Sequence, residues 1–322
     1  MPPDDDARKG LIFGASAYLL WGLFPLYWPL LEPAGTVEIL AQRMTWSLVV
    51  MAIILRVTRG FGRVRTVLAD RRQRHLLVGA AIVVTINWGT YIYGVNSGHV
   101  VETSLGYFIN PLFTILLGVF VLGERLRPMQ WTAVGIGAVA VLVIAVDYGR
   151  PPWIALTLAT SFGLYGFFKK RAAVGAVESM AIETGAMFVP ALVALVVIAV
   201  QGNLVFASHG AGTSLLLAGT GIVTAAPLLL FAASTRRLPL SVIGLLQYLA
   251  PVLQFAVGVG IRHEPLPPAE LIGFALVWLA LIVLTVDGLW SQRRPTPGST
   301  RGLDAAAKIE GESPLPSGTI RT

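Results

Sequence analysis

Two charged residues lie inside long apolar segments, where charge is uncommon. Arg43 lies six residues into an apolar stretch at 37–57, and Glu183 has a comparable position in a stretch at 179–200. If these stretches cross a membrane, each charge costs several kcal/mol at the bilayer centre and usually faces a cavity or a partner. We therefore predict that Arg43 attracts an anionic group of a solute or orients a gate. Glu183 is a candidate for coupling to a proton or an ion.

Each of these two residues also has a plainer interpretation. Arg43 could extend its guanidinium to the membrane surface or tether a loop, and Glu183 could reach the interface at the opposite end. A direct bridge between them is disfavoured, because their backbones would differ in depth by roughly 12 Å across a core of about 30 Å.

A second set of candidates consists of amide and aromatic side chains near prolines in the apolar segments. Prolines in a span free a backbone carbonyl and bend the helix. An aromatic and amide lining suits a flat or amphipathic organic solute, although packing can explain any single aromatic residue. Together with Arg43, the predicted solute-binding residues are Trp21, Asn87, Trp88, Tyr107, Asn110, Gln247 and Tyr248. Glu124 and Glu264 each precede a proline by four residues, and for them we expect helix capping instead.

Several other chemistries are excluded by residue type. Without cysteine, the chain has no disulfide, thiolate metal site or cysteine nucleophile. Its four histidines are scattered without metal-ligand spacing, and it has no Gly-x-x-x-x-Gly-Lys-Ser/Thr run for ATP. We expect no catalytic residues, no metal and no cofactor. An integral membrane enzyme or a lipid scramblase is the alternative to a transporter.

The elements that must position these side chains are membrane-spanning helices. Hydrophobic residues make up 55% of the 322 residues and charged residues 13%, with a mean hydropathy of +0.73; soluble domains carry about 25% charged residues. Spans of about 20 residues are predicted at 11–31, 37–57, 76–95, 101–122, 129–147, 152–169, 179–200, 214–234, 240–261 and 269–290. Trp28, Trp153 and Trp290 lie near span ends and are expected to anchor at the interface.

A repeat at an offset of 140 residues organises these spans. Asn110-Pro111 is followed by Glu124 and Pro128 at the same spacing as Glu264 and Pro268 follow Ala250-Pro251. Five spans per half is an odd number, so the second half would enter the membrane inverted, as in secondary transporters with a site between the halves. The expected domains are a leader at 1–9, a first five-helix repeat at 10–147, an inverted second repeat at 150–290 and a disordered tail at 291–322.

The distribution of basic residues predicts the orientation. Alternate loops carry only Arg150 and Arg262, whereas the remaining loops carry Arg8, Lys9, the arginines of 56–74, Arg125, Arg127, Lys169 to Arg171, Arg236, Arg237, Arg293 and Arg294. Cytoplasmic loops are enriched in Lys and Arg, so both termini are expected in the cytoplasm. The net charge of +7 is then a topology signal, and no nucleic-acid partner is expected. The expected partners are a small solute and the lipid bilayer, and a homodimer is left open.

The chain also resembles a known family. The run from Glu102 to Pro111 (ETSLGYFINP) leads into Leu117-Gly118, Leu122-Gly123-Glu124-Arg125 and Met129-Gln130-Trp131. Further matches are Ala17-Tyr18, Trp21-Gly22, Glu38 to Leu40, Arg43, Trp46-Ser47, Asn87-Trp88, Gly221 to Thr224, Pro227-Leu228, Gln247-Tyr248 and Pro251. These motifs resemble the RarD proteins of the drug/metabolite transporter superfamily, which contain two EamA domains. The resemblance covers about residues 10–294 and implies an all-α, ten-span permease of the bacterial inner membrane, carrying small metabolites or drugs.

Overall fold

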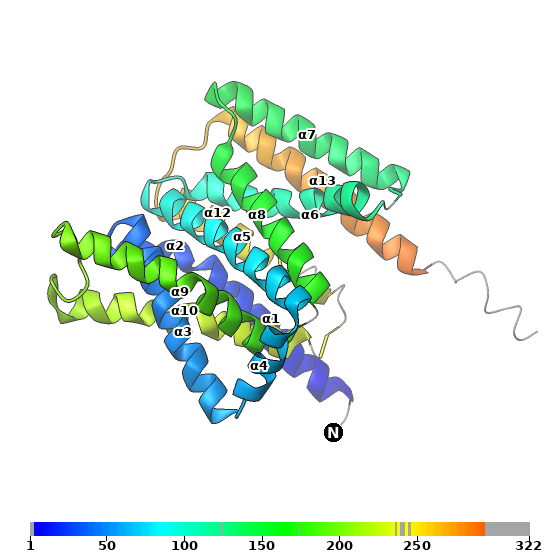
Figure 1. Ribbon diagram of the computed structural model, residues 1–322. Coiled ribbons are helices and arrows are strands. Elements are labelled where there is room, and N and C mark those ends of the chain that lie inside the picture. The colour runs from blue at the N-terminus through cyan, green and yellow to red at the C-terminus, as the bar shows by residue number, and fades with distance from the viewer. Residues whose placement is uncertain are drawn as a thin grey trace, which may run out of the picture.

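The computed structural model describes residues 3–123, 125–172, 174–235, 237–238, 242–243 and 246–293. Glu124, Arg236 and the expected tail from Arg294 onward lie outside these ranges. All regular structure in the described residues is helical (Figure 1). The elements are α1 (Pro3–Gly22), α2 (Phe24–Tyr27), η1 (Trp28–Leu31), α3 (Thr36–Val57), α4 (Phe61–Ala69), α5 (Arg71–Asn96), α6 (Val100–Leu122), α7 (Pro128–Tyr148), α8 (Trp153–Ala172), α9 (Ala176–Val200), α10 (Gly210–Thr235), α12 (Leu249–Gly260) and α13 (Pro268–Arg293).

Within the described part of the chain, seven helices are long and apolar enough to cross a membrane: α3, α5, α6, α7, α9, α10 and α13. The number is eight if α1 with α2 and η1 forms one bent span. α8 and the 12-residue α12 are not among them. The all-α expectation is thus confirmed for the described residues, whereas the count of ten spans stays a prediction.

The first predicted span, 11–31, is broken near its middle. α1 ends at Gly22, and the chain turns by 42° into α2 and η1. Pro25 lies in the first turn of α2, and it has no amide hydrogen to donate to the carbonyl of Trp21 one turn earlier. That carbonyl instead accepts a hydrogen bond of 3.2 Å from Nε2 of Gln254 on α12. A residue of the second half therefore completes the bonding of the first span.

The first helix of each predicted half packs against the other half. α1 lies against α10 and α12, and α8 lies against α5 and α6. Three further contacts join helices that the 140-residue offset relates: α3 packs on α9, α6 on α12, and α7 on α13. α3 also packs on α10, and α5 on α9. Figure 1 shows α7 and α13 side by side along one edge of the bundle, with α3, α9 and α10 toward the opposite edge.

Acidic side chains near the starts of α3 and α9 contact the segments that follow the other helix. Near the start of α3, the carboxylate of Glu38 accepts from the amides of Val205 (3.1 Å) and Phe206 (2.9 Å), just after α9. Near the start of α9, Glu178 accepts from Nε of Arg63 on α4 at 2.5 Å. α3 and α9 are therefore antiparallel. We call the two ends of the bundle the Glu264 end, which holds residues 201–209 and 261–267, and the Arg63 end, which holds residues 58–70.

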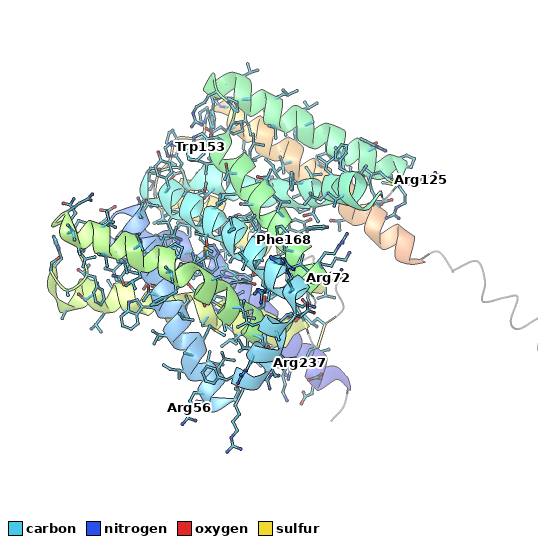
Figure 2. All side chains as sticks on the ribbon, in the orientation of Figure 1. Arg56, Arg72, Arg125, Trp153, Phe168 and Arg237 are labelled. Atoms are coloured by element: carbon cyan, nitrogen blue, oxygen red, sulfur yellow. The ribbon has the colours of Figure 1, made fainter. Side chains whose placement is uncertain are left out.

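Three of the side chains labelled in Figure 2 mark the two ends of the bundle. Arg56 and Arg72 flank α4 at the Arg63 end, and Trp153 opens α8 at the Glu264 end. Trp153 is exposed and contacts Tyr93, and its expected role as an interface anchor stays a prediction. Trp28, for which the same role was expected, is completely buried, so that prediction is wrong. The broken first span turns the indole of Trp28 into the protein.

Candidate functional site

The guanidinium of Arg43 lies inside the protein. α3 places Ile39, Arg43 and Ser47 at a spacing of four residues, which puts them on one face of the helix, and all three are buried. Only 2% of Arg43 is exposed, so the interpretation of an arginine that reaches the membrane surface is wrong. Nε donates to Oγ1 of Thr224 on α10 at 2.9 Å, whereas Nη1 is buried without a hydrogen-bond partner.

Close packing between α3 and α10 brings Thr224 within reach of Arg43. Gly221 lies three residues before Thr224, and a Cβ there would clash with the backbone of Trp46 on α3. Glycine therefore permits the two helices to approach each other at this height. Thr224 also donates to the carbonyl of Thr220, so it uses its hydroxyl hydrogen within α10 and offers Arg43 an acceptor.

Three aromatic rings surround the guanidinium. Its central carbon lies 3.8 Å from the ring centre of Trp88, 5.1 Å from that of Trp28 and 5.8 Å from that of Phe24. Each such contact stabilises a cation by about 0.5–2 kcal/mol. Aromatic rings offer no lone pairs in their plane, however, so they do not replace a hydrogen-bond acceptor for Nη1.

The side chain of Asn87 on α5 links α6 and α8, and both its amide nitrogen and its amide oxygen have hydrogen-bond partners. Its Nδ2 donates to the carbonyl of Leu158 (3.1 Å) and to Oγ of Ser161 (3.0 Å), both on α8. Its Oδ1 accepts from the hydroxyl of Tyr107 on α6 at 3.2 Å. In this arrangement Asn87 fixes the position of Tyr107, and its expected place in the solute site stays a prediction.

Two tyrosines continue the polar region beyond Asn87. The rings of Tyr91 and Tyr107 meet edge to face, with centres 5.7 Å apart, and both residues pack in the cluster that contains Trp28. The hydroxyl of Tyr91 is buried without a hydrogen-bond partner. Asn110 lies one turn after Tyr107, where its Oδ1 accepts from Thr114 and its Nδ2 has no partner.

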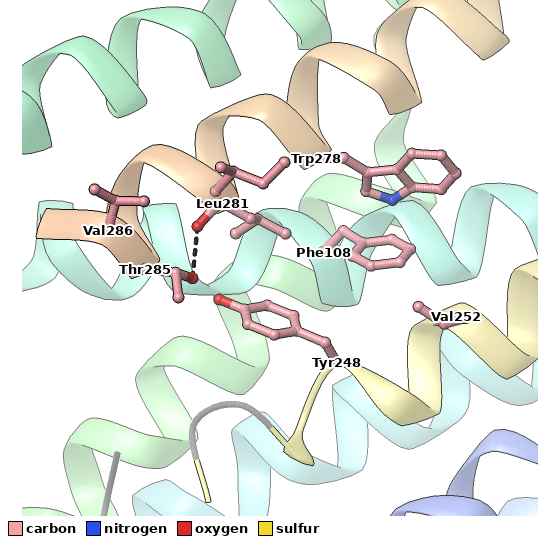
Figure 3. A pocket seen from close by; sticks show the side chains of 8 residues that line it. Phe108, Tyr248, Val252, Trp278, Leu281, Thr285 and Val286 are labelled. Carbon is pink, nitrogen blue, oxygen red and sulfur yellow. Dashed lines mark hydrogen bonds between the residues drawn. The ribbon is translucent and has the colours of Figure 1, made fainter. Parts of the chain in front are cut away.

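The remaining predicted residues divide into two groups. Trp21 packs against the same apolar cluster as Phe24, Trp28 and Tyr91, and its ring meets Phe231. Gln247 is exposed in a turn before α12. Tyr248 belongs to a different apolar cluster. Figure 3 shows it in an open, apolar groove of about 460 Å³ with Phe108 and Trp278, between α6, α12 and α13.

Glu183 also lies inside the protein, near the Arg63 end. Only 4% of it is exposed. Its Oε1 accepts from Nζ of Lys169 at 2.9 Å and from Oγ of Ser179 at 2.5 Å, and its Oε2 accepts from the hydroxyl of Tyr165 at 3.1 Å. Glu183 therefore has a built-in countercharge. The five ion pairs among the described residues do not include an Arg43–Glu183 bridge, which agrees with the depth argument.

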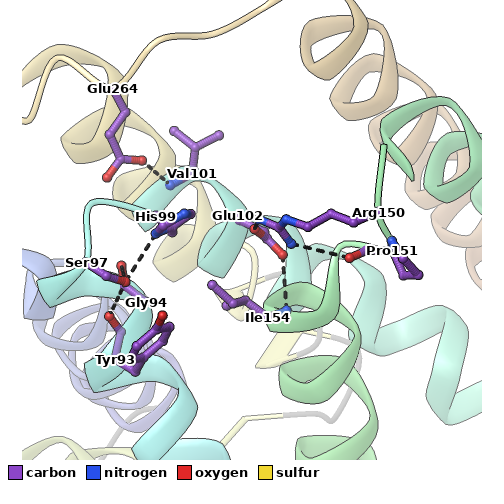
Figure 4. A network of polar contacts seen from close by, with 10 residues as sticks. All are labelled: Tyr93, Gly94, Ser97, His99, Val101, Glu102, Arg150, Pro151, Ile154 and Glu264. Atoms are coloured by element: carbon purple, nitrogen blue, oxygen red, sulfur yellow. Dashed lines mark hydrogen bonds and ion pairs between the residues drawn. The ribbon is translucent and has the colours of Figure 1, made fainter. Parts of the chain in front are cut away.

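At the Glu264 end, two carboxylates hold helix starts (Figure 4). Glu264 accepts from the first two amides of α6, those of Val100 and Val101, each at 2.7 Å. A carboxylate at a helix N-terminus satisfies orphan donors and matches the helix dipole. Glu102 in turn accepts from the amide of Ile154 on α8 and from Arg150. Capping was expected of Glu264, and it caps α6.

No group of three or more His, Cys, Asp or Glu side chains within the described ranges could hold a metal ion.

Several known proteins are similar in sequence to this chain along most of its length. A family model described as the EamA-like transporter family matches residues 8–146. Protein RarD of Streptomyces exfoliatus is 53% identical over 95% of this chain and 96% of its own. Protein RarD of Escherichia coli is 38% identical over 89% and 97%, and the uncharacterized transporter YojE of Bacillus subtilis is 41% identical over 87% and 94%. The chain belongs to the RarD group of the EamA-like transporter family.

A RarD-group protein is a multi-pass membrane transporter of the drug/metabolite type, which the apolar helices described above also support. A solved crystal structure matches this fold with a TM-score of 0.54, covering 87% of this chain and 97% of its own at 20% identity. At that identity the likeness concerns the fold alone.

For this RarD-group chain, the structure brings Arg43, Trp88, Asn87 and Tyr107 together and leaves Gln247 and Tyr248 elsewhere. Sequence reasoning missed Thr224 and Trp28, which contact Arg43. It also missed Ser47, buried one turn after Arg43, and Tyr91, buried in the cluster of Trp28. One signal was present: Ser47 follows Arg43 by one helical turn in an otherwise apolar stretch. The Thr224 contact spans 181 positions, and only the packing of α3 on α10 reveals it.

Proposed function

We propose that this protein is a secondary transporter that exports small organic solutes across the bacterial inner membrane by alternating access. Two observations support the proposal. First, the packing of α1 and α8 is exchanged: each packs on helices of the opposite half. Second, helices related by the repeat pack on each other, namely α3 on α9, α6 on α12, and α7 on α13. Rotation about an in-plane two-fold axis reproduces such a pattern. Transporters built from inverted repeats move one repeat against the other around a central site.

The proposed topology has ten spans, as two inverted repeats at 10–147 and 150–290. It counts α8 as a span, although Lys169, Lys170 and Arg171 occupy its last turn, because these residues would lie at the cytoplasmic interface. α12 supplies most of the described part of the ninth span. Both termini and the Arg63 end face the cytoplasm in this proposal, and the Glu264 end faces the periplasm.

The proposed solute site is centred on Arg43 and its surrounding rings. Trp88, Tyr107 and Asn110 line it from α5 and α6, Trp21 borders it from α1, and Asn87 holds Tyr107 in position. Arg43 on α3 is bonded to Thr224 on α10, so the site crosses the boundary between the halves. A movement between α3 and α10 would therefore change the contacts of the guanidinium directly.

The proposed coupling site is Glu183. Protonation of its carboxylate would weaken the ion pair with Lys169 and the hydrogen bond with Tyr165, both of which join α9 to α8. Buried carboxylates inside membrane bundles commonly serve as proton-relay groups. Coupling here would release the Arg63 end when the carboxylate binds a proton.

The proposal is tested first in cells and then in liposomes. Metabolites and antibiotics retained by cells producing the protein are compared with those in cells producing Arg43→Ala at matched membrane levels. Solutes that differ are then assayed in proteoliposomes with and without a pH gradient. We expect solute-specific export that the gradient stimulates. If no solute differs and labelled phospholipids exchange between leaflets at a rate that depends on the protein, then the protein is a scramblase and the proposal is wrong.

A further inference from the structure

Four buried groups without partners gather around one guanidinium. They are Nη1 of Arg43, Nε1 of Trp28, Oγ of Ser47 and the hydroxyl of Tyr91. The Trp28 ring centre lies 5.1 Å from the guanidinium carbon, Ser47 follows Arg43 by one turn on the same helix face, and Tyr91 belongs to the same buried cluster as Trp28. All four can donate a hydrogen bond, and the arginine and indole nitrogens can only donate.

The same neighbourhood shows no countercharge among the described residues. None of the five ion pairs among the described residues includes Arg43, and its guanidinium contacts a hydroxyl and three aromatic rings. A buried cation is normally paired or coordinated. The donors and the charge around Arg43 therefore complement an anionic acceptor.

Its repeat counterpart shows what a completed charge pair looks like in this fold. Glu183 lies 140 positions after Arg43, at the corresponding place on α9, and is equally buried. α8 supplies Glu183 with Lys169 and Tyr165. The corresponding part of the first span, α2 and η1, supplies Arg43 with Phe24 and Trp28 instead. Among the described residues, the protein supplies a countercharge to Glu183 and none to Arg43.

We propose that Arg43 binds the carboxylate of a small aromatic or amphipathic monocarboxylic acid, so that the transported solute is an organic anion. This rests on the proposed function and names the class of its solute. A planar guanidinium matches the two oxygens of a carboxylate, and Trp28, Ser47 and Tyr91 offer further donors. Among the described residues, no second cation contacts this cluster, so a monoanion balances the charge. The rings of Trp88, Trp28 and Phe24 around the guanidinium give the neighbourhood an aromatic lining that suits a solute with an apolar or aromatic body.

The test uses acids and their neutral amides as matched probes. Phenylacetate with phenylacetamide, and indole-3-acetate with indole-3-acetamide, are added to the full-length protein in nanodiscs, with benzoate and acetate completing the panel. Binding is measured by tryptophan fluorescence and by the shift in unfolding temperature. We expect an acid to bind roughly tenfold or more tightly than its amide, since only the acid forms charge-assisted hydrogen bonds. Arg43→Gln should remove this preference, and Arg43→Lys should retain part of it.

Arg262→Gln is the control variant, because it removes an exposed positive charge at the Glu264 end without touching the cluster. It should keep the preference for acids. Equal binding of acid and amide, an acid preference that survives Arg43→Gln, or no binding by any acid of the panel would overturn the inference. Uptake of the same probes into proteoliposomes separates the two proposals. Acid binding that depends on Arg43 without transport contradicts the transport function, whereas equal transport of acid and amide contradicts only the carboxylate assignment.

Discussion

Lys169 and Glu183 form an ion pair of 2.9 Å across α8 and α9, whereas Arg43, the repeat counterpart of Glu183, meets no carboxylate among the described residues. The two buried charges occupy related positions on the antiparallel helices α3 and α9. One is satisfied within the protein and the other is not. Substitution of Arg43 should therefore abolish transport and spare stability, whereas substitution of Glu183 should lower stability.

Replacement of Arg43 should abolish transport without harming the fold. Arg43→Met removes a buried cation that has one hydrogen bond and three ring contacts but no countercharge among the described residues, and apolar replacements of similar volume for buried ionic groups are often neutral or stabilising by about 1–4 kcal/mol. Thr224 keeps its bond to Thr220, so no new orphan hydroxyl appears. We expect an equal or higher unfolding temperature in nanodiscs, together with loss of solute transport in proteoliposomes.

The lysine variant serves as the graded comparison. Arg43→Lys keeps the charge but loses the planar fork, so it should restore transport only in part. Normal transport by Arg43→Ala would show that the guanidinium has no role in the solute site.

Disruption of the Lys169–Glu183 pair should be destabilising. Glu183→Gln leaves Lys169 without its countercharge, and Lys169→Met leaves Glu183 buried without its cation. Each single change should lower the free energy of unfolding by at most about 2 kcal/mol. Solvent screens part of the interaction, because the Lys169 side chain is 25% exposed. The double variant should cost less than the sum of the singles in a double-mutant cycle.

The same variants test coupling. If Glu183 carries the coupling proton, Glu183→Gln should make solute flux insensitive to the pH gradient while solute binding persists. A Glu183→Gln protein whose flux still follows the gradient would exclude this carboxylate as the coupling group. Ser179→Ala removes a neutral partner of the carboxylate and serves as the control that keeps the titrating group.

Removal of the Glu264 carboxylate should lower stability and leave solute recognition intact. Glu264 satisfies the first two amides of α6, and loss of a helix cap typically costs about 1 kcal/mol. We expect Glu264→Ala to reduce the folded yield and the unfolding temperature. Glu32→Ala removes an exposed acid at the same end and should change neither. Loss of acid binding in well-folded Glu264→Ala would show that the solute site lies at the Glu264 end.

Single-cysteine labelling should place the two ends on opposite sides of the membrane. The chain is free of cysteine, so Ser97→Cys, His209→Cys, Gly62→Cys and Arg171→Cys each introduce one exposed thiol. An impermeant maleimide added to intact spheroplasts should label positions 97 and 209, and label 62 and 171 only after lysis. Labelling of position 62 but not 97 from outside would reverse the orientation or change the span count.

The sequence predicted helices well where an apolar run is long and uninterrupted. The stretch predicted at 37–57 is α3 (Thr36–Val57), and the run at 179–200 is the main part of α9 (Ala176–Val200). The span at 11–31 contains a break, and the loop at 56–74 contains α4. Apolar composition measures suitability for a membrane, but it does not locate the hydrogen bonds that proline removes.

The candidate site was predictable only in part, and for a physical reason. A charge in an apolar run signals burial or function, which identified Arg43 and Glu183. Composition does not show whether a buried polar group already has partners. Asn87 has three, and the hydroxyl of Tyr91 has none, although both lie four residues apart on α5. Likewise, Trp28 near a span end looked like an interface anchor until the break at Gly22 turned it inward.

The exchanged packing of α1 also sets an order for biosynthesis. α1 ends at Gly22, but α10, against which it packs, begins only at Gly210. At about 5–20 residues per second, the ribosome needs roughly 10–40 s to make the chain between them. During this time α1 lies in the membrane without α10. The Trp21 carbonyl lacks its hydrogen bond for longer, because Gln254 is synthesised after α10. A nascent chain stopped before residue 210 should therefore be a target for membrane proteases, and co-production of the missing half should protect it.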